Sequence, residues 1–256
     1  MFDLKEFPTS LQKFYHDNND LRPHLEPQPN KDSQWIYQQS DIPWLKLNID
    51  TPHEEMYREA KSWIDEMVPQ NYKELFDNPV LDGEFPNQKG WNTICVHGIG
   101  PKHFDRGYMY GYGHEDEVPY IWTEVADQCP ITKEYLQSLP YEKLYRARFT
   151  MLAPGGYAAP HIGRKKAASH SRKINVALNH PKGFHFHLEG QGPIPWEPGR
   201  AHLIAADDFY HAVFNQSDEV RIHLITMGKP DFKRLEPLIQ ESYYSDDPFG
   251  YKNWEA

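Results

Sequence analysis

The amino-acid sequence predicts a mainly β protein with flanking helices, an α+β chain whose strands close into a sandwich or barrel. From Tyr145 onward, short apolar stretches alternate with Gly- and Pro-bearing turns at regular spacing, which favours an antiparallel sandwich or barrel over a parallel sheet. An earlier segment, residues 53–67, instead has the apolar spacing of a helix. The chain has 256 residues, of which 39% are apolar and 25% charged, so it can bury a sizeable core.

The polar, Pro-bearing residues 1–50 are expected to form an extended arm that wraps the body, with a short helix near residues 11–16. The helix predicted over 53–67 has Thr51 as its cap and Pro52 in its first turn. Its apolar residues recur at spacings of three and four, at Met56, Ala60, Trp63 and Met67.

The chain is predicted to divide into an N-terminal arm with a helical elaboration (1–89), a core domain (90–228) and a C-terminal helix and tail (229–256), which together form one structural domain. Helices are expected at 132–139 and 231–242. Strands are expected at 90–98, 145–152, 172–179, 184–189, 201–206, 210–214 and 220–227, and turns at 154–156, 181–183, 190–193 and 198–199.

Charge and composition exclude several classes of partner. The 27 Lys and Arg residues face 37 Asp and Glu residues, and the resulting net charge of -10 argues against nonspecific binding to nucleic acid or to an anionic membrane. No apolar run approaches the about 20 residues that a membrane-spanning helix needs. No secretory signal is visible, and the 2 cysteines are too few for a disulfide scaffold. We therefore expect a reduced, cytoplasmic location without membrane insertion.

Two of the 14 histidines stand where a predicted turn meets a predicted strand. His161 follows the turn at 154–156, and His211 enters the strand at 210–214, so both can converge on one end of a barrel. Arg221 follows His211 by ten residues, inside the otherwise apolar stretch VRIHLITM. A buried arginine needs an anionic partner, and its planar fork suits a carboxylate, either of a ligand or of the protein itself. This set predicts a metal site beside a carboxylate site.

These motifs resemble the aspartyl/asparaginyl β-hydroxylase family of 2-oxoglutarate oxygenases. The matching stretches are RARFTMLAPGGYAAPHIG, SRKINVALNHPKGF, WEPG and DDFYHAVFNQSDEVRIHL, and the resemblance extends over about residues 90–228. It implies a double-stranded β-helix core, that is, a cupin-like jelly roll. It also implies that His161 and His211 bind Fe(II), and that Arg221 and Thr150 bind 2-oxoglutarate.

The sequence departs from the family pattern on the strand that follows the first metal ligand. Lys173 and Asn175 stand where the family carries an Arg-x-His pair, and strand alternation places both on one face as further cosubstrate-binding residues. The facial triad of related oxygenases would need an acidic residue at position 163, but Gly163 cannot ligate. Two imidazoles and a bidentate cosubstrate leave positions for water and O2 at a metal with about six ligands.

The activity that the resemblance implies is a dioxygenase reaction that hydroxylates an unactivated C–H bond and yields succinate and CO2. The substrate is expected to be an Asp, Asn or Pro residue, a free amino acid or a related polar group, presented as a small molecule, a peptide or a protein. Two alternatives stay open. A halogenase-like oxygenase could bind chloride at the carboxylate-free iron, and a non-catalytic jelly-roll protein could retain only the scaffold.

Several other residues are candidates for the site. His185, His187 and Glu189 could form a cupin-like metal strand, but they would then turn the intervening Phe and Leu residues toward solvent, so a structural role is favoured. Asp207 and Asp208 are expected to support His211. His223 alternates with Arg221 and could approach the cosubstrate. Further candidates are a basic loop at 164–166, which could attract an acidic substrate, and a cleft wall formed by Trp91 and residues 108–112.

Overall fold

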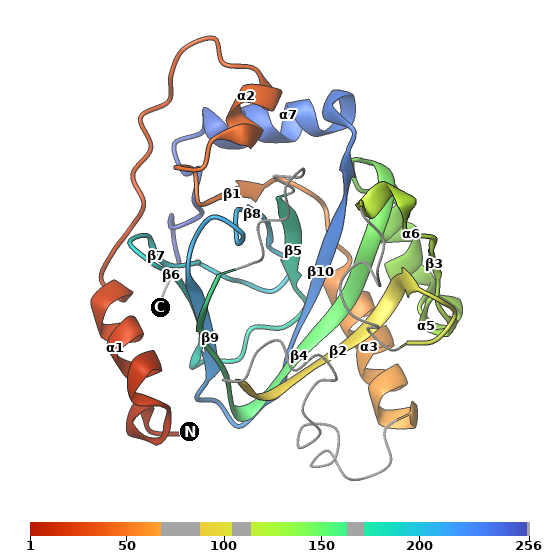
Figure 1. The fold of residues 1–256 in the computed structure, drawn as a ribbon, viewed down its shortest axis with the longest axis horizontal. Helices are drawn as coiled ribbons and strands as arrows, with labels where there is room; N and C mark the ends of the chain where they lie inside the picture. The colour runs from red at the N-terminus through yellow and green to blue at the C-terminus, as the bar shows by residue number, and fades with distance from the viewer. Residues whose placement is uncertain (68–87, 104–113, 163–171, 255–256) are drawn as a thin grey trace.

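The computed structural model describes residues 1–67, 88–103, 114–162 and 172–254, and its core is a jelly roll. The core strands are β4 (Tyr141–His161), β5 (Lys173–Ala177), β6 (Phe184–Leu188), β7 (Gly192–Pro193), β8 (Ala201–Ile204), β9 (His211–Asn215) and β10 (Arg221–Pro230). The strand order is β8-β5-β10-β4 in one layer and β4-β9-β6-β7 in the other, and every pairing is antiparallel. The predicted fold class is confirmed (Figure 1).

Strand β4 belongs to both layers because it bends between them. Its first part pairs with β10, and its last residues pair with β9. The prediction of a strand that stops at 152 before a turn was wrong, because the chain stays extended through the bend. Gly155 has a φ of +66°, and a Cβ on Gly156 would lie 2.8 Å from the carbonyl oxygen of Ala153. Glycine is therefore required where β4 passes from one layer to the other.

Strands at both edges extend the layer that contains β5 and β10. On one side β1 (Trp44–Leu47) pairs with β8, and on the other β2 (Gln88–Ile99) pairs with β4 and with β3 (Tyr120–Trp122). The expectation of an arm with one short helix was incomplete. The N-terminal segment holds η1 (Leu4–Glu6), α1 (Thr9–Asn18) and α2 (Ser33–Gln38), and through β1 it also supplies an edge strand.

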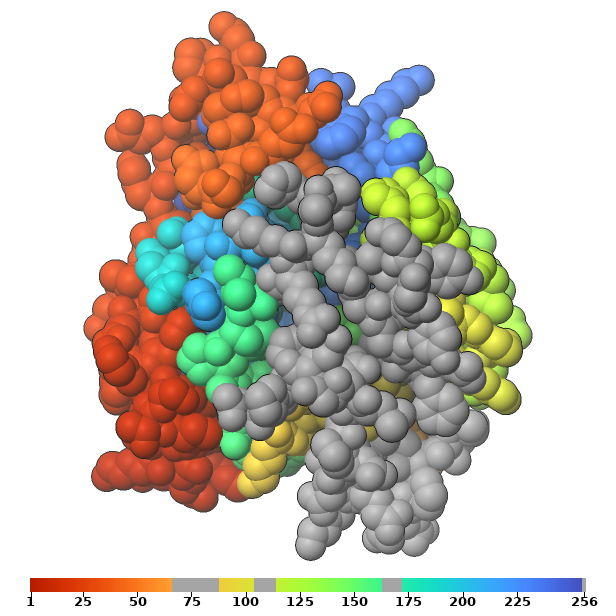
Figure 2. Space-filling model, viewed as in Figure 1, coloured from red at the N-terminus to blue at the C-terminus, as the bar shows by residue number. Residues whose placement is uncertain are grey.

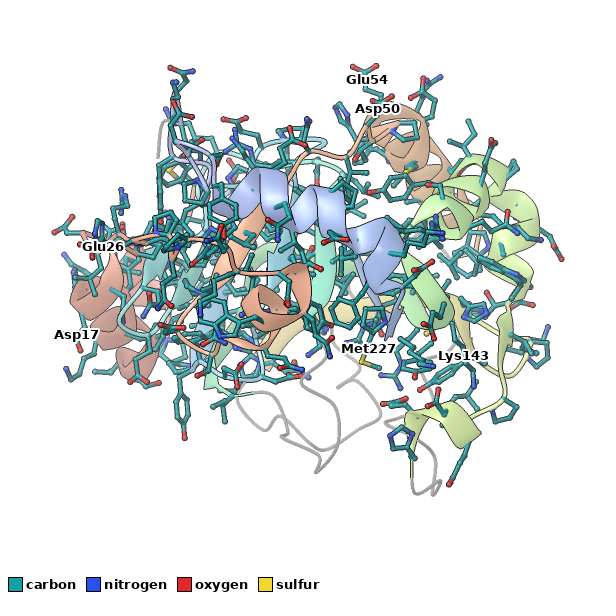
Figure 3. The ribbon with its side chains drawn as sticks, turned by 90° about the horizontal axis from the view of Figure 1, so that it is seen from above. Asp17, Glu26, Asp50, Glu54, Lys143 and Met227 are labelled. Atoms are coloured by element: carbon teal, nitrogen blue, oxygen red, sulfur yellow. The ribbon has the colours of Figure 1, made fainter. Side chains whose placement is uncertain are left out.

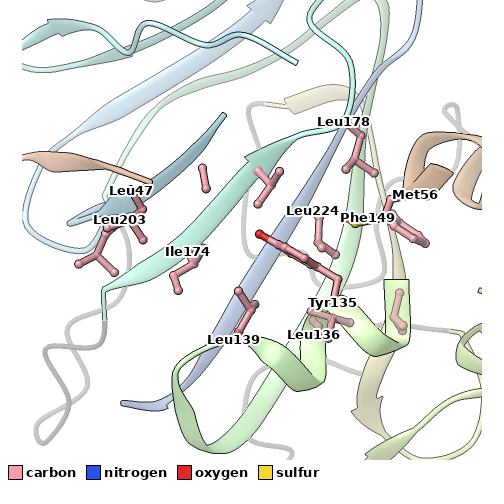
Figure 4. Packing of buried hydrophobic residues seen from close by; sticks show 14 of the residues in the cluster. Leu47, Met56, Tyr135, Leu136, Leu139, Phe149, Ile174, Leu178, Leu203 and Leu224 are labelled. Carbon is pink, nitrogen blue, oxygen red and sulfur yellow. The ribbon is translucent and has the colours of Figure 1, made fainter. Parts of the chain in front are cut away.

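Helices cover the outer face of this layer. The helix predicted over 53–67 is α3 (His53–Met67), and the two later predicted helices are found as α6 (Pro130–Ser138) and α7 (Phe232–Tyr243). Two further helices, α5 (Glu124–Gln128) and the short η3 (Glu115–Glu117), were not predicted from the sequence. Figure 4 shows side chains of α3 and α6, such as Met56 and Leu136, gathered against Phe149 and Leu224 of the sheet. This packing forms the larger hydrophobic core.

The alternation of side chains along β4 separates that outer core from the interior of the jelly roll. Phe149 and Met151 belong to the outer cluster under the helices, whereas Leu152 belongs to a second cluster between the two layers. Arg148 and Thr150 share the inward face with Leu152. Polar side chains of the sheet therefore enter the interior of the jelly roll.

The N-terminal segment covers part of the surface. Figure 2 shows it, in red to orange, over the left and upper parts of the viewed face. Figure 3 shows the carboxylates of Asp17, Glu26, Asp50 and Glu54 projecting outward from this segment and the start of α3, which agrees with the acidic net charge. No helix within the described ranges is long and apolar enough to cross a membrane.

Candidate active site

The two predicted metal ligands face each other at the rim of the jelly roll. His161 ends β4 and His211 begins β9, and the two residues are register partners in the ladder between these strands. Their ring centroids lie 4.3 Å apart. Because a metal–imidazole bond is about 2 Å long, two rings this close can both reach one ion. The bend in β4 produces this pairing, since it carries His161 into the layer that contains β9.

Local hydrogen bonds fix the protonation of both rings. Nδ1 of His161 lies 2.7 Å from the carbonyl oxygen of Ala159, and Nδ1 of His211 lies 3.1 Å from that of Phe209. Each Nδ1 must donate to its carbonyl, so Nε2 carries the lone pair of the neutral ring. Burial lowers the pKa of His161, and burial together with the neighbouring His161 lowers the pKa of His211 to about 3. Both imidazoles are therefore neutral near pH 7, as metal ligands must be.

The described part of the chain contains no group of three or more His, Cys, Asp or Glu side chains that could hold a metal ion. Position 163, where the sequence has Gly163, lies outside the described residues, as do the basic loop at 164–166, His170 and the residues at 108–112. A metal bound by the histidine pair would complete its coordination with ligands from beyond the described residues, such as a bidentate cosubstrate and water.

A cavity of about 170 Å³ opens beside the histidine pair between the two layers. Its wall includes Trp91, as predicted, and the carbon skeletons of Phe186 and Ile204. The polar residues of the wall are Gln88, Thr93, Arg148, His161, Lys173, Asn175, His211, Arg221 and His223. Five of the six predicted site residues thus line one cavity, although they come from four different strands.

Arg221 occupies the deep end of this cavity and is 2% exposed. One of its terminal nitrogens donates to Oγ1 of Thr150 at 2.9 Å, and its guanidinium lies between the rings of Trp91 and Phe184, 5.1 and 4.7 Å from their centroids. No ion pair among the described residues involves Arg221, and its Nε has no hydrogen-bond partner there. Burial lowers its pKa to about 9. Within the described ranges, the guanidinium therefore lacks the anion that a buried charge requires.

Thr150 is placed differently from what the resemblance implied. It is fully buried and does not line the cavity. Its hydroxyl accepts from Arg221 and lies 3.3 Å from the backbone oxygen of His223, to which it donates. In this structure Thr150 orients the arginine from behind.

Lys173 and Asn175 both line the cavity from β5. The ammonium of Lys173 pairs with Asp207 at 2.7 Å, and its charge lowers the pKa of both His161 and His211, so it lies at the metal end. Asp207 therefore supports the site through Lys173. Asn175 is buried, and its Oδ1 has no hydrogen-bond partner among the described residues.

Sequence reasoning missed three polar cavity residues: Gln88 and Thr93 on β2, and Arg148 on β4. A signal for Arg148 existed, because it alternates with Thr150 in the stretch RARFT and must share its face. The prediction that His185 and His187 are structural residues rather than metal ligands is confirmed. His185 and His187 point away from the cavity and pack against Tyr15 of α1, at ring-centroid distances of 5.3 and 5.1 Å.

Residues 69–230, more than half of the chain, match the family model described as aspartyl/asparaginyl beta-hydroxylase. The chain belongs to this family. It is accordingly a hydroxylase, and membership implies Fe(II) and 2-oxoglutarate as its cofactors. No curated protein matches the chain significantly in sequence.

Solved structures with some likeness to this family member include two hydroxylases and a further oxygenase. A prolyl-4-hydroxylase from Pseudomonas putida has 14% identity and a TM-score of 0.40, over 76% of this chain and 98% of its own. A 2OG-Fe(II) oxygenase family oxidoreductase from Burkholderia pseudomallei has 13% identity and a TM-score of 0.42, over 82% and 98%. A viral collagen prolyl hydroxylase from Paramecium Bursaria Chlorella virus-1 has 15% identity and a TM-score of 0.39, over 72% of this chain and 94% of its own. TM-scores of this size do not establish a shared fold, so the fold assignment depends on the strand topology.

The residues present fit the two implied cofactors. Two neutral imidazoles with oriented Nε2 atoms suit Fe(II). In the same cavity, the guanidinium of Arg221 has no counterion from the described part of the chain, and it suits a carboxylate of a dianionic ligand. The orphaned Oδ1 of Asn175 leaves a further polar contact for a ligand or water.

Proposed function

We propose that this hydroxylase is an Fe(II)/2-oxoglutarate dioxygenase whose iron is held by His161 and His211 and whose cosubstrate is held by Arg221 and Lys173. The observation that carries the proposal is one cavity lined both by a neutral histidine pair and by a buried arginine that has no counterion among the residues the structure describes. When bound, iron and 2-oxoglutarate supply the oxidation: with O2, a C–H bond becomes C–OH, and 2-oxoglutarate becomes succinate and CO2.

The protein's own residues bind, orient and exclude water. Arg221 pairs with the cosubstrate carboxylate that is remote from the metal, and Thr150 fixes the direction of the guanidinium. Lys173, held by Asp207, lies at the metal end and balances the charge of the other carboxylate. Trp91 and Phe184 cover the faces of the guanidinium and keep water from it. Each part of a dianionic ligand thus has a matching partner.

The substrate is proposed to be an Asp, Asn or Pro residue of a peptide or protein, a free amino acid or a related polar molecule. Arg148 supports a polar or anionic substrate, because it lines the same cavity and follows the inward face of β4 next to Thr150. Its guanidinium is suited to a carboxylate or an amide oxygen.

Two measurements test the proposal. Anaerobic addition of 2-oxoglutarate to the Fe(II)-loaded protein should produce a visible metal-to-ligand charge-transfer band. Incubation in air with Asp-, Asn- and Pro-containing peptides and free amino acids should add one oxygen to a substrate and release an equal amount of succinate. His161→Ala and His211→Ala should abolish both signals, whereas His24→Ala, at an exposed position, should retain them. Wild-type turnover in either site variant would refute the assignment. Chlorinated product in chloride buffer would favour a halogenase instead, and absence of the band in the wild type would favour a binding protein.

A further inference from the structure

The inner faces of three neighbouring strands form the floor of the cavity, and their register fixes the order of its polar residues. Strands β5, β10 and β4 lie side by side (Figure 1). Asn175 of β5 is opposite Ile225 of β10, which in turn is opposite Arg148 of β4. One step deeper, His223 of β10 is opposite Thr150 of β4. Opposite residues in an antiparallel sheet share a face, with Cβ atoms about 4.5–5.5 Å apart.

The guanidinium of Arg221 reaches back to this deeper step. Arg221 itself is register partner of Leu152, but its terminal nitrogen donates to Oγ1 of Thr150 at 2.9 Å. The imidazole of His223 and the guanidinium of Arg221 are thus both at the level of Thr150, and both residues line the cavity. Any carboxylate that pairs with Arg221 in the cavity comes to lie beside His223.

His223 has unmet hydrogen-bonding capacity at this place. It is 1% exposed, and neither Nδ1 nor Nε2 has a hydrogen-bond partner among the described residues. Phe184 and Trp196 contact the ring through their own rings, at centroid distances of 5.4 and 4.6 Å. Burial of an imidazole without any partner is costly, so such a group in a ligand cavity indicates a missing partner.

The neighbourhood indicates that the missing partner is an anion. Arg221 already supplies a positive charge and lacks a counterion among the described residues, so a cation would be repelled. Burial and the charge of Arg221 keep the pKa of His223 well below its usual value, so the ring is neutral and carries one N–H donor. A carboxylate accepts from that donor and from the guanidinium at the same time.

We propose that His223 is a further cosubstrate-binding residue, which donates a hydrogen bond to the same 2-oxoglutarate carboxylate that pairs with Arg221. This inference rests on the proposed function, because it takes 2-oxoglutarate as the ligand of the cavity. It assigns the distal carboxylate to two donors from one strand, Arg221 and His223, with Thr150 behind them. His223 thereby selects cosubstrates that have a second carboxylate.

The test compares two ligands and two variants of similar size by titration calorimetry on the protein loaded with redox-inert manganese(II). Oxalate can chelate the metal but has no distal carboxylate. His223→Met fills the site without a donor, and we expect it to weaken 2-oxoglutarate binding about 10- to 100-fold while oxalate binding changes less than about twofold. His223→Gln retains an N–H donor and should recover most of the affinity for 2-oxoglutarate.

A matched control is His202→Met. His202 is equally buried, contacts the same Trp196 ring at 4.6 Å and does not line the cavity, so its variant should bind both ligands like the wild type. A second measurement uses the wild type loaded with diamagnetic zinc(II), and it needs a variant only to assign the signals. The imidazole ¹⁵N signals of His223 should shift when 2-oxoglutarate binds but not when oxalate binds.

Three results would overturn the inference. The first is an unchanged affinity of His223→Met for 2-oxoglutarate, and the second is an equal loss of affinity for 2-oxoglutarate and oxalate in that variant. The third is that the ¹⁵N signals of His223 in the wild type do not shift when 2-oxoglutarate is added. The first would show that water or packing satisfies the imidazole. If the wild type binds neither ligand, the proposed function itself fails, and that outcome is distinguishable from the other three.

Discussion

Replacing Arg221 by methionine should stabilise the ligand-free protein while abolishing cosubstrate binding. Burial lowers the pKa of Arg221 from 12.5 to about 9, which corresponds to roughly 5 kcal/mol of unfavourable desolvation. Methionine removes that cost, but it also loses two hydrogen bonds to Thr150, about 1 kcal/mol each, and about 1–2 kcal/mol of contact with the Trp91 and Phe184 rings. The balance is a gain of about 1–2 kcal/mol, or a Tm higher by about 2–6 °C.

The assay is thermal unfolding of the manganese-loaded protein with and without 2-oxoglutarate. At a ligand concentration of about 100 Kd, binding stabilises the wild type by about 2.7 kcal/mol, whereas the Arg221→Met variant should show no shift. A variant that is less stable than the wild type and still responds to 2-oxoglutarate would refute the reasoning.

A second buried arginine provides the matched control. Arg172 is also buried, and burial lowers its pKa to about 10, but its guanidinium donates to the backbone oxygens of Tyr37, Gln39 and Ile42. Arg172→Met leaves these carbonyls without their donor and should cost about 3 kcal/mol or more. If Arg221→Met raises the stability and Arg172→Met lowers it, the result would support an external ligand as the binding partner of Arg221 but not of Arg172.

Three further predictions concern the support of the site and of the fold. Asp207→Asn should raise the Kd of 2-oxoglutarate up to about fivefold, because the partly exposed ion pair with Lys173 contributes at most about 1 kcal/mol. Lys173→Ala should raise this Kd further, and calorimetry that finds the larger effect in Asp207→Asn would contradict the prediction. Burial lowers the pKa of His187 to about 3, so His187 is protonated in the unfolded chain before it is protonated in the folded one. The free energy of unfolding therefore decreases as the pH falls from about 6.5 toward 3, and the loss is roughly 2 kcal/mol at pH 5. His187→Gln should reduce the difference in stability between pH 7 and pH 5, as measured by denaturant titration. The variant His24→Gln, at an exposed position, should not change that difference. Gly156→Ala should lower stability by about 1–3 kcal/mol, because its Cβ meets the backbone at the bend; a Tm within 1 °C of the wild type would contradict this.

Local signals determined what could be predicted from the sequence. The bounds of the helix over 53–67 were predicted correctly because its signals are local: Thr51 and Pro52 directly precede it, and the apolar spacing lies within it. The strands after Tyr145 were found because Gly and Pro mark their ends. The proximity of His161, His211 and Arg221 in one cavity could be predicted because each residue stands at or inside a predicted strand.

Long-range contacts determined what could not be predicted. Strand β1 lies in a polar arm and is stabilised by pairing with β8, about 150 residues later, so nothing near Trp44 indicates an edge strand. The bend of β4 cannot be distinguished from a turn in the sequence, because Gly155 and Gly156 are equally suited to both. The place of Thr150 behind Arg221 depends on the register of β4 with β10, which no local pattern encodes.

The departures of this chain from the family pattern are consistent with one another once the register is known. Lys173 lacks the fork of an arginine, but it is held in one position by Asp207, so a point charge suffices at the metal end. Asn175 removes an imidazole from β5, and His223 supplies one from the adjacent strand, one step nearer Arg221. Under the proposal for His223, this chain thus places an imidazole nearer to the distal carboxylate than the family pattern does. If this is the physical reason for the exchange, Asn175→His combined with His223→Leu should restore part of the 2-oxoglutarate affinity lost in His223→Leu alone. Calorimetry that finds the double variant no tighter than the single one would show that the two positions are independent.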